Sequence, residues 1–338
     1  MPIMVMPDRL IRIVTHSSIE LGNRGRLVYS AFPDSPSDCS GHGTQVASII
    51  GGTNVGVAKL ANVNVLQVLD CDGNGSNSDL IDGINFVIAN HQKPAVINLS
   101  LGGPRSPSVD QAVRAAVDAG IFVVVAAGNE NTDACTQSPA AVAEAVTVAA
   151  IAQRNTRAKF SNYGPCVDIF APGVDILTAA IPAKSRNGYV FGSGTSFSAP
   201  FVAGVAALLL ESNPKMSPQQ LTDKILGISA KSILSPSTLL GSPNLLLQAP
   251  PVRSSNVMLV RLTDPSKLPA YGYHMSSIAS VELILIIIAA ICTLVAILAT
   301  SATMFMKYRA NRMDANNVMS DADIKASVFS SRRPSVFL

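Results

Sequence analysis

Charge is scarce in this sequence: Asp, Glu, Lys and Arg make up 14% of the 338 residues, and the formal net charge is only +3. No dense basic stretch is interleaved with aromatic residues, so the electrostatic footprint of a nucleic-acid-binding protein is missing and we expect no nucleic acid partner. Low hydrophobicity, the mark of intrinsic disorder, is missing as well. Because 48% of the residues are apolar, the sequence predicts a sizeable hydrophobic core.

A secretory signal near the start and internal repeats are also lacking. A signal peptide needs an apolar central segment, and the opening MPIMVMPDRL is too short to supply one. We expect either that a later apolar segment directs membrane insertion or that the sequence is missing its true beginning.

Such a segment is present near the C-terminus. The run LILIIIAAICTLVAILATSATMFM (283–306) contains no charge, and about 20 apolar residues suffice to cross a bilayer as a helix. The alternative, a buried core helix, is usually shorter and carries a polar edge. Lys307, Arg309 and Arg312 follow the run, whereas Glu282 precedes it. The positive-inside rule therefore predicts a single-pass membrane protein with a cytoplasmic tail and an extracellular or lumenal domain.

Four cysteines precede this segment, namely Cys39, Cys71, Cys135 and Cys166, and Cys292 lies within it. Four cysteines allow three pairings, and the sequence alone does not choose among them. An oxidising compartment favours disulfides, with four buried free thiols as the alternative.

Short apolar runs alternate with helix-like segments over the first three quarters of the chain. Strands are predicted at 63–70, 95–101, 121–128 and 145–151, and helices at 79–90 and 108–118. Strands that are apolar on both faces and alternate with helices indicate a parallel sheet covered on each side. The sequence therefore predicts a three-layer α/β domain, with its chemistry at the carboxyl ends of the strands.

Three stretches place reactive or polar groups beside glycines. SGHGTQVAS contains His42, VVVAAGNEN ends a buried strand with Gly128 and Asn129, and GSGTSFSAP places Ser196 at the start of a long apolar helix. A histidine can act as a base toward a serine hydroxyl. A helix N-terminus and an asparagine amide can stabilise an oxyanion. Taken singly, these residues are more often a structural histidine, a turn asparagine and a helix cap.

Together, and in this chain order, the motifs GHGT, AAGN and GTSFSAP resemble the subtilisin-like serine proteases, and the intervening INLSLGG, FSNYG and DIFAPGVDI resemble the proteinase K-like branch. The resemblance covers residues 11–248. It implies a subtilisin-like α/β fold with a mainly parallel sheet and helices on both faces. It also implies an endopeptidase in which Ser196 is the nucleophile, His42 the general base and Asn129 the oxyanion donor.

The same resemblance implies where a polypeptide substrate binds. Ser100, Leu101 and Gly102 match the strand edge that pairs with extended substrate, whereas Ala127 and Gly128 match one wall of the pocket for the residue before the scissile bond. The chemistry requires no cofactor, and we expect a monomer.

Disulfides and a structural metal are further implications. The contexts DCSGHGT and VLDCDGNG match a subgroup whose pairs would be Cys39–Cys71 and Cys135–Cys166 here. Asp168, with carbonyl groups near Ala143 and Ala145, falls where the branch often binds a structural calcium. The loop DCDGNGSNSD only superficially resembles an EF-hand, because its twelfth position is Ile81 rather than a glutamate.

The aspartate that completes the family's Ser-His-Asp catalytic triad lies in the stretch that matches the family pattern least well. Asp8 takes its place in MPDRLIRI, but Leu10 stands where the family has a glycine that permits a tight turn, and Pro7 would remove a strand hydrogen bond. No convincing strand precedes it. The sequence departs from the family pattern at three further positions. Gln45 stands where a second histidine is usual, Ser48 where a glycine is common, and Phe201 where a histidine is frequent.

The sequence thus predicts a membrane-tethered serine endopeptidase. Its expected parts are a catalytic domain (1–248) whose N-terminal part is missing or altered, a linker (249–280), a transmembrane helix (281–306) and a disordered tail (307–338). Two alternatives stay open: a catalytically silent binding module on the protease fold, and an incomplete gene model of an active protease.

Overall fold

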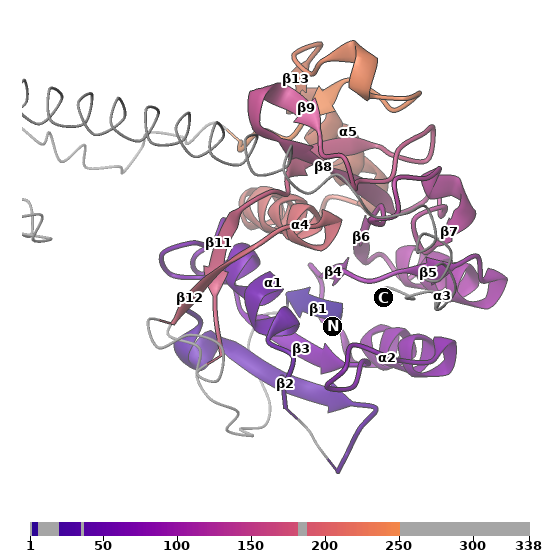
Figure 1. Cartoon of the computed structure of the whole chain (residues 1–338). Helices are drawn as coiled ribbons and strands as arrows, with labels where there is room; N and C mark the ends of the chain where they lie inside the picture. The colour runs from indigo at the N-terminus through magenta and orange to yellow at the C-terminus, as the bar shows by residue number, and fades with distance from the viewer. Residues whose placement is uncertain (1, 6–19, 35–36, 182–187, 251–338) are drawn as a thin grey trace, which may run out of the picture. The chain divides into compact units, whose positions relative to one another are not determined.

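The apolar runs of the sequence form strands of one large sheet (Figure 1). The computed structural model describes residues 2–5, 20–34, 37–181 and 188–250, with side chains from Glu20 onward. Asp8, the predicted transmembrane helix and the predicted tail lie outside these residues, as does the predicted linker beyond residue 250.

The main sheet has the strand order β13-β14-β10-β8-β6-β4-β1-β3-β2, and β9 pairs with β8. Its members are β1 (Pro2–Val5), β2 (Gly25–Ser30), β3 (Val63–Gln67), β4 (Val96–Leu99), β6 (Phe122–Ala126), β8 (Val146–Ala152), β9 (Thr156–Arg157), β10 (Ile169–Pro172), β13 (Ala230–Lys231) and β14 (Leu245–Leu246). Two small sheets pair β5 (Gly103–Pro104) with β7 (Gln137–Ser138), and β11 (Ile176–Ala179) with β12 (Tyr189–Gly192).

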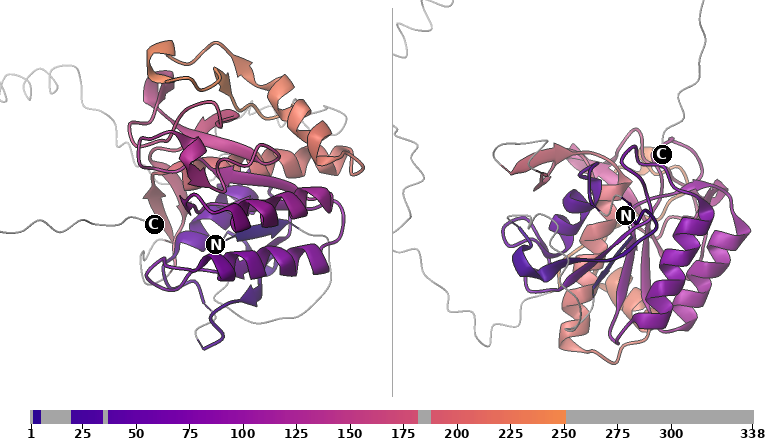
Figure 2. Two further views of the ribbon diagram at one scale, coloured as in Figure 1. Left: turned by 90° about the vertical axis from the view of Figure 1, so that its right-hand side faces the viewer. Right: turned by 90° about the horizontal axis from the view of Figure 1, so that it is seen from below.

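Helices cover both faces of the sheet (Figure 2). The α-helices are α1 (His42–Gly51), α2 (Asn77–Asn90), α3 (Pro107–Asp118), α4 (Thr195–Ser212) and α5 (Pro218–Ile228). Helices α1, α4 and α5 contribute to one core with the sheet, and α2 and α3 to another. Short 3-10 turns lie at Gly22–Arg24, Ala134–Thr136, Gln153–Asn155 and Pro236–Thr238.

Strand β6 shows why its sequence is apolar throughout. Val124 and Ala126 pack in the core with α4, whereas Val123 and Val125 pack in the core with α2 and α3. Successive side chains of a strand point to opposite faces, so a strand covered on both sides has no polar position. The predicted three-layer α/β architecture is confirmed.

Helix α4 is the one helix of the described ranges that is long and apolar enough to cross a membrane, but 67% of it is buried inside the protein. Its residues Ala199, Val202, Ala203 and Ala206 are fully buried. It is the central core helix of the domain.

At the edges of the sheet, β9 with β8 and β13 with β14 are antiparallel pairs; among the central strands, β1 is the exception to the parallel order. It lies between β3 and β4 and pairs antiparallel with both, whereas β2 with β3, β4 with β6, β6 with β8 and β8 with β10 are parallel pairs. The expectation that no strand precedes Asp8 was therefore wrong. A four-residue apolar stretch carries too little periodicity to predict a strand, and here pairing on both edges supplies the hydrogen bonds that stabilise it.

Candidate active site

The nucleophile candidate, Ser196, lies in the first turn of α4 and is half-buried. Polar groups from two strand ends surround this turn. Ser100 directly follows β4, and its hydroxyl donates to the carbonyl oxygen of Ser196 at 2.7 Å. Asn129 follows β6, and its side chain is bonded to the neighbouring Thr195. The helix start thus lies at the carboxyl ends of β4 and β6, where the strand pattern predicted the chemistry.

The amide of Asn129 is held in one orientation. Its Oδ1 accepts from the main-chain N–H of Thr195 at 2.8 Å and from the Thr195 hydroxyl at 3.0 Å. Because a main-chain N–H can only donate, the atom facing Thr195 must be the oxygen. The Nδ2 group therefore keeps its two N–H bonds for another acceptor. Asn129 itself is exposed, as a donor to a substrate oxyanion must be.

His42 is the first residue of α1, and the turn before it is built around Asp38. One carboxylate oxygen of Asp38 accepts from Gly41 N at 2.9 Å and the other from Thr44 N at 2.6 Å. These bonds satisfy free N–H groups of the helix start, and negative charge is favourable there. Gly41 has φ 80°, a left-handed conformation that favours glycine.

The His42 ring lies 5.9 Å, centroid to centroid and edge-on, from the ring of Phe197. Phe197 is the residue after Ser196, and α1 packs against α4. The structure therefore places His42 and Asn129 beside Phe197 and Thr195, the two neighbours of Ser196 in the chain. A serine at a helix N-terminus with a histidine and a fixed amide donor around it is the arrangement typical of a serine hydrolase.

The proposed substrate-binding residues flank this region. Leu101 is half-buried and Gly102 is exposed, whereas Ser100 is buried and turned toward Ser196. Ala127 is buried, and its carbonyl accepts from Asn162 Nδ2 at 2.9 Å. The edge therefore offers main-chain groups of Leu101 and Gly102 rather than the Ser100 side chain.

Gly128 has no room for a side chain. It has φ 103°, and a Cβ there would lie 2.2 Å from Asn162 Nδ2 and 2.7 Å from Glu130 Oε2. Asn162 is fully buried, and its Oδ1 accepts from the N–H groups of Glu130 and Thr132 at 3.1 and 3.0 Å. Asn162 thus shapes the loop that carries Asn129.

Two of the residues that depart from the family pattern, Ser48 and Gln45, make hydrogen bonds to β11. Ser48 is fully buried and accepts from Ala179 N in β11 at 2.9 Å. Gln45 Nε2 donates to the Thr178 hydroxyl at 3.2 Å. Both bonds join α1 to the β11–β12 hairpin that leads to Ser196. Phe201, the third departure, packs against the core around α4.

Asp8 stays a prediction, because it lies outside the described residues. Strand β1 does show which way the preceding chain runs. Pro2 pairs with Leu99 at the carboxyl end of β4, and Val5 pairs with Val96 at its amino end. The strand before Asp8 therefore runs away from the edge that carries Ser196, opposite to the direction of its neighbours β3 and β4.

Both predicted disulfides are present, Cys39–Cys71 and Cys135–Cys166. The first joins the turn before His42 to the loop after β3, across a sequence separation of 32 residues. Closing a loop of this length stabilises a protein by about 4 kcal/mol in the chain-entropy account.

We expect the double substitution Cys39→Ser and Cys71→Ser to lower the free energy of unfolding by about 4 kcal/mol. Denaturant unfolding of both proteins under non-reducing conditions measures the difference. Coincident unfolding midpoints would contradict the prediction.

Asp168, the proposed calcium ligand, precedes β10. Its Oδ2 accepts from Thr147 N at 2.7 Å. Burial raises the pKa of this carboxyl to about 6, and the Thr147 hydrogen bond only partly opposes that rise. No group of three or more His, Cys, Asp or Glu side chains in the described ranges is arranged to hold a metal. Asp168 is thus a single carboxylate that could ligate calcium only if carbonyl or water oxygens supply most of the usual 6–8 ligands.

Without bound metal, Asp168 should make stability fall with rising pH. The folded protein binds this proton more tightly than the unfolded chain, so the carboxyl opposes folding once it ionises. The penalty develops between about pH 4 and pH 6 and reaches about 3 kcal/mol, from a pKa near 6 against the ordinary 3.8. Asp168→Asn should therefore gain stability relative to the parent on going from pH 4 to pH 8 in EDTA. Parallel pH profiles of the free energy of unfolding would contradict this expectation.

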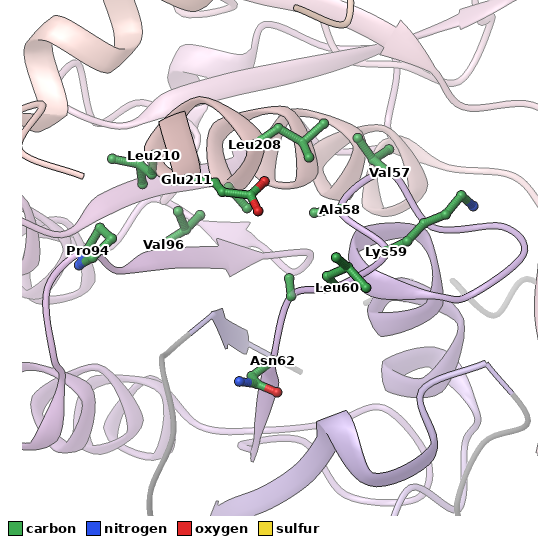
Figure 3. A pocket seen from close by; sticks show the side chains of 12 residues that line it. Val57, Ala58, Lys59, Leu60, Asn62, Pro94, Val96, Leu208, Leu210 and Glu211 are labelled. Carbon is green, nitrogen blue, oxygen red and sulfur yellow. The ribbon is translucent and has the colours of Figure 1, made fainter. Parts of the chain in front are cut away.

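An apolar pocket of about 450 Å³ lies elsewhere (Figure 3). Leu208, Leu210 and Glu211 of α4 face Leu60, Asn62 and Val96 across it. Leu208 follows Ser196 by 12 residues, which is about 18 Å along a helix. The pocket also adjoins the amino ends of β3 and β4, so it lies far from the candidate nucleophile.

With this geometry established, comparison with known proteins defines the family. The subtilase family model matches residues 23–242. The chain is 48% identical over 216 residues to the extracellular serine proteinase of Thermus sp. strain Rt41A, covering 64% of this chain and 52% of the relative. It is 45% identical over 237 residues to alkaline serine exoprotease A of Vibrio alginolyticus, covering 69% and 43%.

A solved structure agrees. The crystal structure of a cold-adapted subtilisin-like serine proteinase matches with a TM-score of 0.64 and 42% identity, over 69% of this chain and 84% of that one. The chain belongs to the subtilase family. It spans about half the length of the curated relatives it matches.

Sequence reasoning missed the residues that hold the site together. Thr195 fixes the Asn129 amide, Asp38 holds the turn before His42, and Asn162 holds the loop after β6. Asp38 could have been found, because an acidic residue just before a helix start is a capping signal. The partners of Thr195 and Asn162 are distant in sequence, so no local pattern marks them.

Proposed function

We propose that the chain is a serine endopeptidase. The observation that carries the proposal is the bond network in which Thr195 holds the Asn129 amide beside Ser196 at the start of α4. Family membership and relatives named as serine proteinases support it. An extended polypeptide pairs with the main chain of Leu101 and Gly102, which places its scissile carbonyl near Ser196.

The reaction proceeds in two halves. His42 takes the hydroxyl proton of Ser196 while the oxygen attacks the carbonyl carbon, and Asn129 Nδ2 with a main-chain N–H of the helix start stabilises the oxyanion. The peptide C–N bond then breaks, His42 returns the proton to the leaving amine, and an acyl ester on Ser196 remains. Water, deprotonated by His42, hydrolyses that ester and regenerates the hydroxyl.

The test is hydrolysis of a chromogenic peptide amide and a matching peptide ester by the purified full chain. If the ester and the amide pass through a common acyl-enzyme, the ester should give a burst whose amplitude equals the concentration of active sites. The absence of hydrolysis of both substrates, with the protein folded, would contradict the proposal.

Replacing Asn129 with leucine should lower kcat by about 10²–10³-fold and leave KM nearly unchanged, because the lost donor acts mainly on the transition state. Steady-state kinetics on the peptide amide measure the effect. Asn90→Ala, at the end of α2, is the control and should behave as the parent. A loss confined to KM would show that Asn129 binds the ground state instead.

A catalytically silent binding module is the second candidate, and the direction of β1 favours it. In that case the strand leading to Asp8 never delivers a carboxylate to His42. Loss of the orienting aspartate lowers kcat by about 10⁴-fold in serine proteases. A kcat at least about 10⁴-fold lower than that of an intact serine protease, with Ser196 still required for the residual turnover, would indicate a damaged enzyme and favour the binding module.

We further propose that residues 281–306 tether the domain to a membrane, with the catalytic part extracellular or lumenal and residues 307–338 cytoplasmic. The uncharged run 283–306 and its basic flank support this proposal. Resistance of the full chain to carbonate extraction from membranes tests it, and release into the supernatant would contradict it.

A structural calcium at Asp168 is also a proposal, supported by the desolvated carboxyl group. Calcium should then raise Tm of the parent and have no effect on Asp168→Asn. An equal calcium response in the two proteins would place the ion elsewhere, and no response in the parent would exclude this site.

A further inference from the structure

Proline occupies a special position in α4. Pro200 lies four residues after Ser196, inside the helix. In an α-helix the carbonyl of residue i accepts from the N–H of residue i+4. Proline has no N–H, and its ring crowds the carbonyl one turn earlier. The main-chain carbonyl of the candidate nucleophile therefore lacks its ordinary helical donor.

Ser100 supplies the missing donor from another element. Its hydroxyl, which is 2% exposed, donates to the Ser196 carbonyl at 2.7 Å. Ser100 follows β4 directly, so the bond joins the helix start to the carboxyl end of a central strand. It is a contact between residues 96 positions apart.

Asn98 orients this hydroxyl. Its Nδ2 donates to Ser100 Oγ at 2.9 Å, and Asn98 is fully buried. A serine hydroxyl has one proton, which Ser100 places on the Ser196 carbonyl, so Ser100 must accept from Asn98. Within the part of the chain that the structure describes, Asn98 Oδ1 has no partner, an arrangement normally unfavourable for a buried polar atom. The two hydrogen bonds therefore have one donor direction: Asn98 donates to Ser100, and Ser100 donates to the carbonyl of Ser196.

We propose that Ser100 is a positioning residue for the nucleophile, with Asn98 fixing its hydroxyl. The inference rests on the proposed function. One hydrogen bond sets Ser196 against the end of β4, whose next residues, Leu101 and Gly102, form the proposed substrate edge. The end of β4 then fixes the position of the nucleophile relative to the bound peptide. Pro200 has no N–H, so the carbonyl of Ser196 stays available for the bond from Ser100.

Ser100→Ala tests the proposal, because it removes the hydroxyl and keeps the main-chain groups at the substrate edge. We expect kcat to fall by about 10- to 100-fold, the effect of a displacement of about 1 Å, with KM within about twofold of the parent. Tm should fall by about 2–6 °C, because a carbonyl loses its donor. Ser212→Ala, at the exposed end of α4, is the matched control and should change neither value.

A second substitution distinguishes two roles of Ser100: positioning Ser196 for catalysis, and merely supplying a hydrogen bond to its carbonyl. In the double variant Ser100→Ala, Pro200→Ala, the alanine that replaces the proline offers an N–H to the Ser196 carbonyl within the helix. Tm should recover toward the parent value, while kcat should stay low because the tie to β4 is still absent. Recovery of kcat together with Tm would overturn the proposal, as would an unchanged kcat in Ser100→Ala.

The thermal measurements also distinguish this inference from the proposed function. If the parent shows no turnover that depends on Ser196, the proposed function is wrong. The effects of Ser100→Ala and Pro200→Ala on Tm should nevertheless be non-additive, since both act on one carbonyl. Additive effects would contradict the hydrogen-bond coupling whether or not the chain hydrolyses peptides.

Discussion

Ser196→Ala should lower kcat for peptide hydrolysis by about a million-fold, a magnitude that comes from subtilisin, a member of the same family. The physical reason is that the substitution removes the only atom that forms the acyl ester in the proposed mechanism. What remains is catalysis by oriented binding and the oxyanion donors, about 10³–10⁴-fold over water. Active-site-titrated kinetics on the peptide amide measure the loss.

Ser198 offers a matched control in the same helix. It is fully buried, two residues beyond Ser196, and its hydroxyl has no hydrogen-bond partner among the residues that the structure describes. Ser198→Ala should therefore fold at least as well as the parent and keep its activity. Equal activity of Ser196→Ala and the parent would mean that another residue is the nucleophile.

Asp8→Ala should lower kcat by about 10⁴-fold if Asp8 holds His42 in the required tautomer and orientation. Loss of an orienting carboxylate leaves the nucleophile and oxyanion donors in place, so the effect is smaller than for Ser196. The measurement is again kcat on the peptide amide, with Asp72→Ala in an exposed loop as the control.

An Asp8→Ala variant as active as the parent would show that Asp8 is not the third triad member. That result would agree with the antiparallel direction of β1, which leads the chain away from the edge that carries Ser196. If the variant loses activity as expected, Asp8 must reach His42. The antiparallel β1, which leads the chain away from Ser196, would then have to change its position in the active enzyme.

Much of the domain could be predicted because its signals are local. The predicted strand 121–128 corresponds to β6 (Phe122–Ala126), and the predicted helix 108–118 corresponds to α3 (Pro107–Asp118). Runs such as FVVV cannot be solvent-exposed, so their burial on both faces follows from composition. The resemblance also predicted both disulfides, and both are present in the structure.

The direction of β1 could not be predicted, because it depends on which edges are free in the folded sheet rather than on Pro2–Val5 themselves. The same holds for the bonds that build the candidate site. Thr195 with Asn129 and Ser100 with Ser196 are separated by 66 and 96 residues. Only the fold brings such pairs within hydrogen-bond distance.

Covalent labelling with a fluorophosphonate tests the central claim most directly, because it needs an activated serine but no particular substrate. We predict that the folded full chain reacts stoichiometrically, that mass spectrometry places the adduct on Ser196, and that His42→Ala slows the reaction by orders of magnitude. A folded chain that does not react, or that reacts at a serine other than Ser196, would contradict the account.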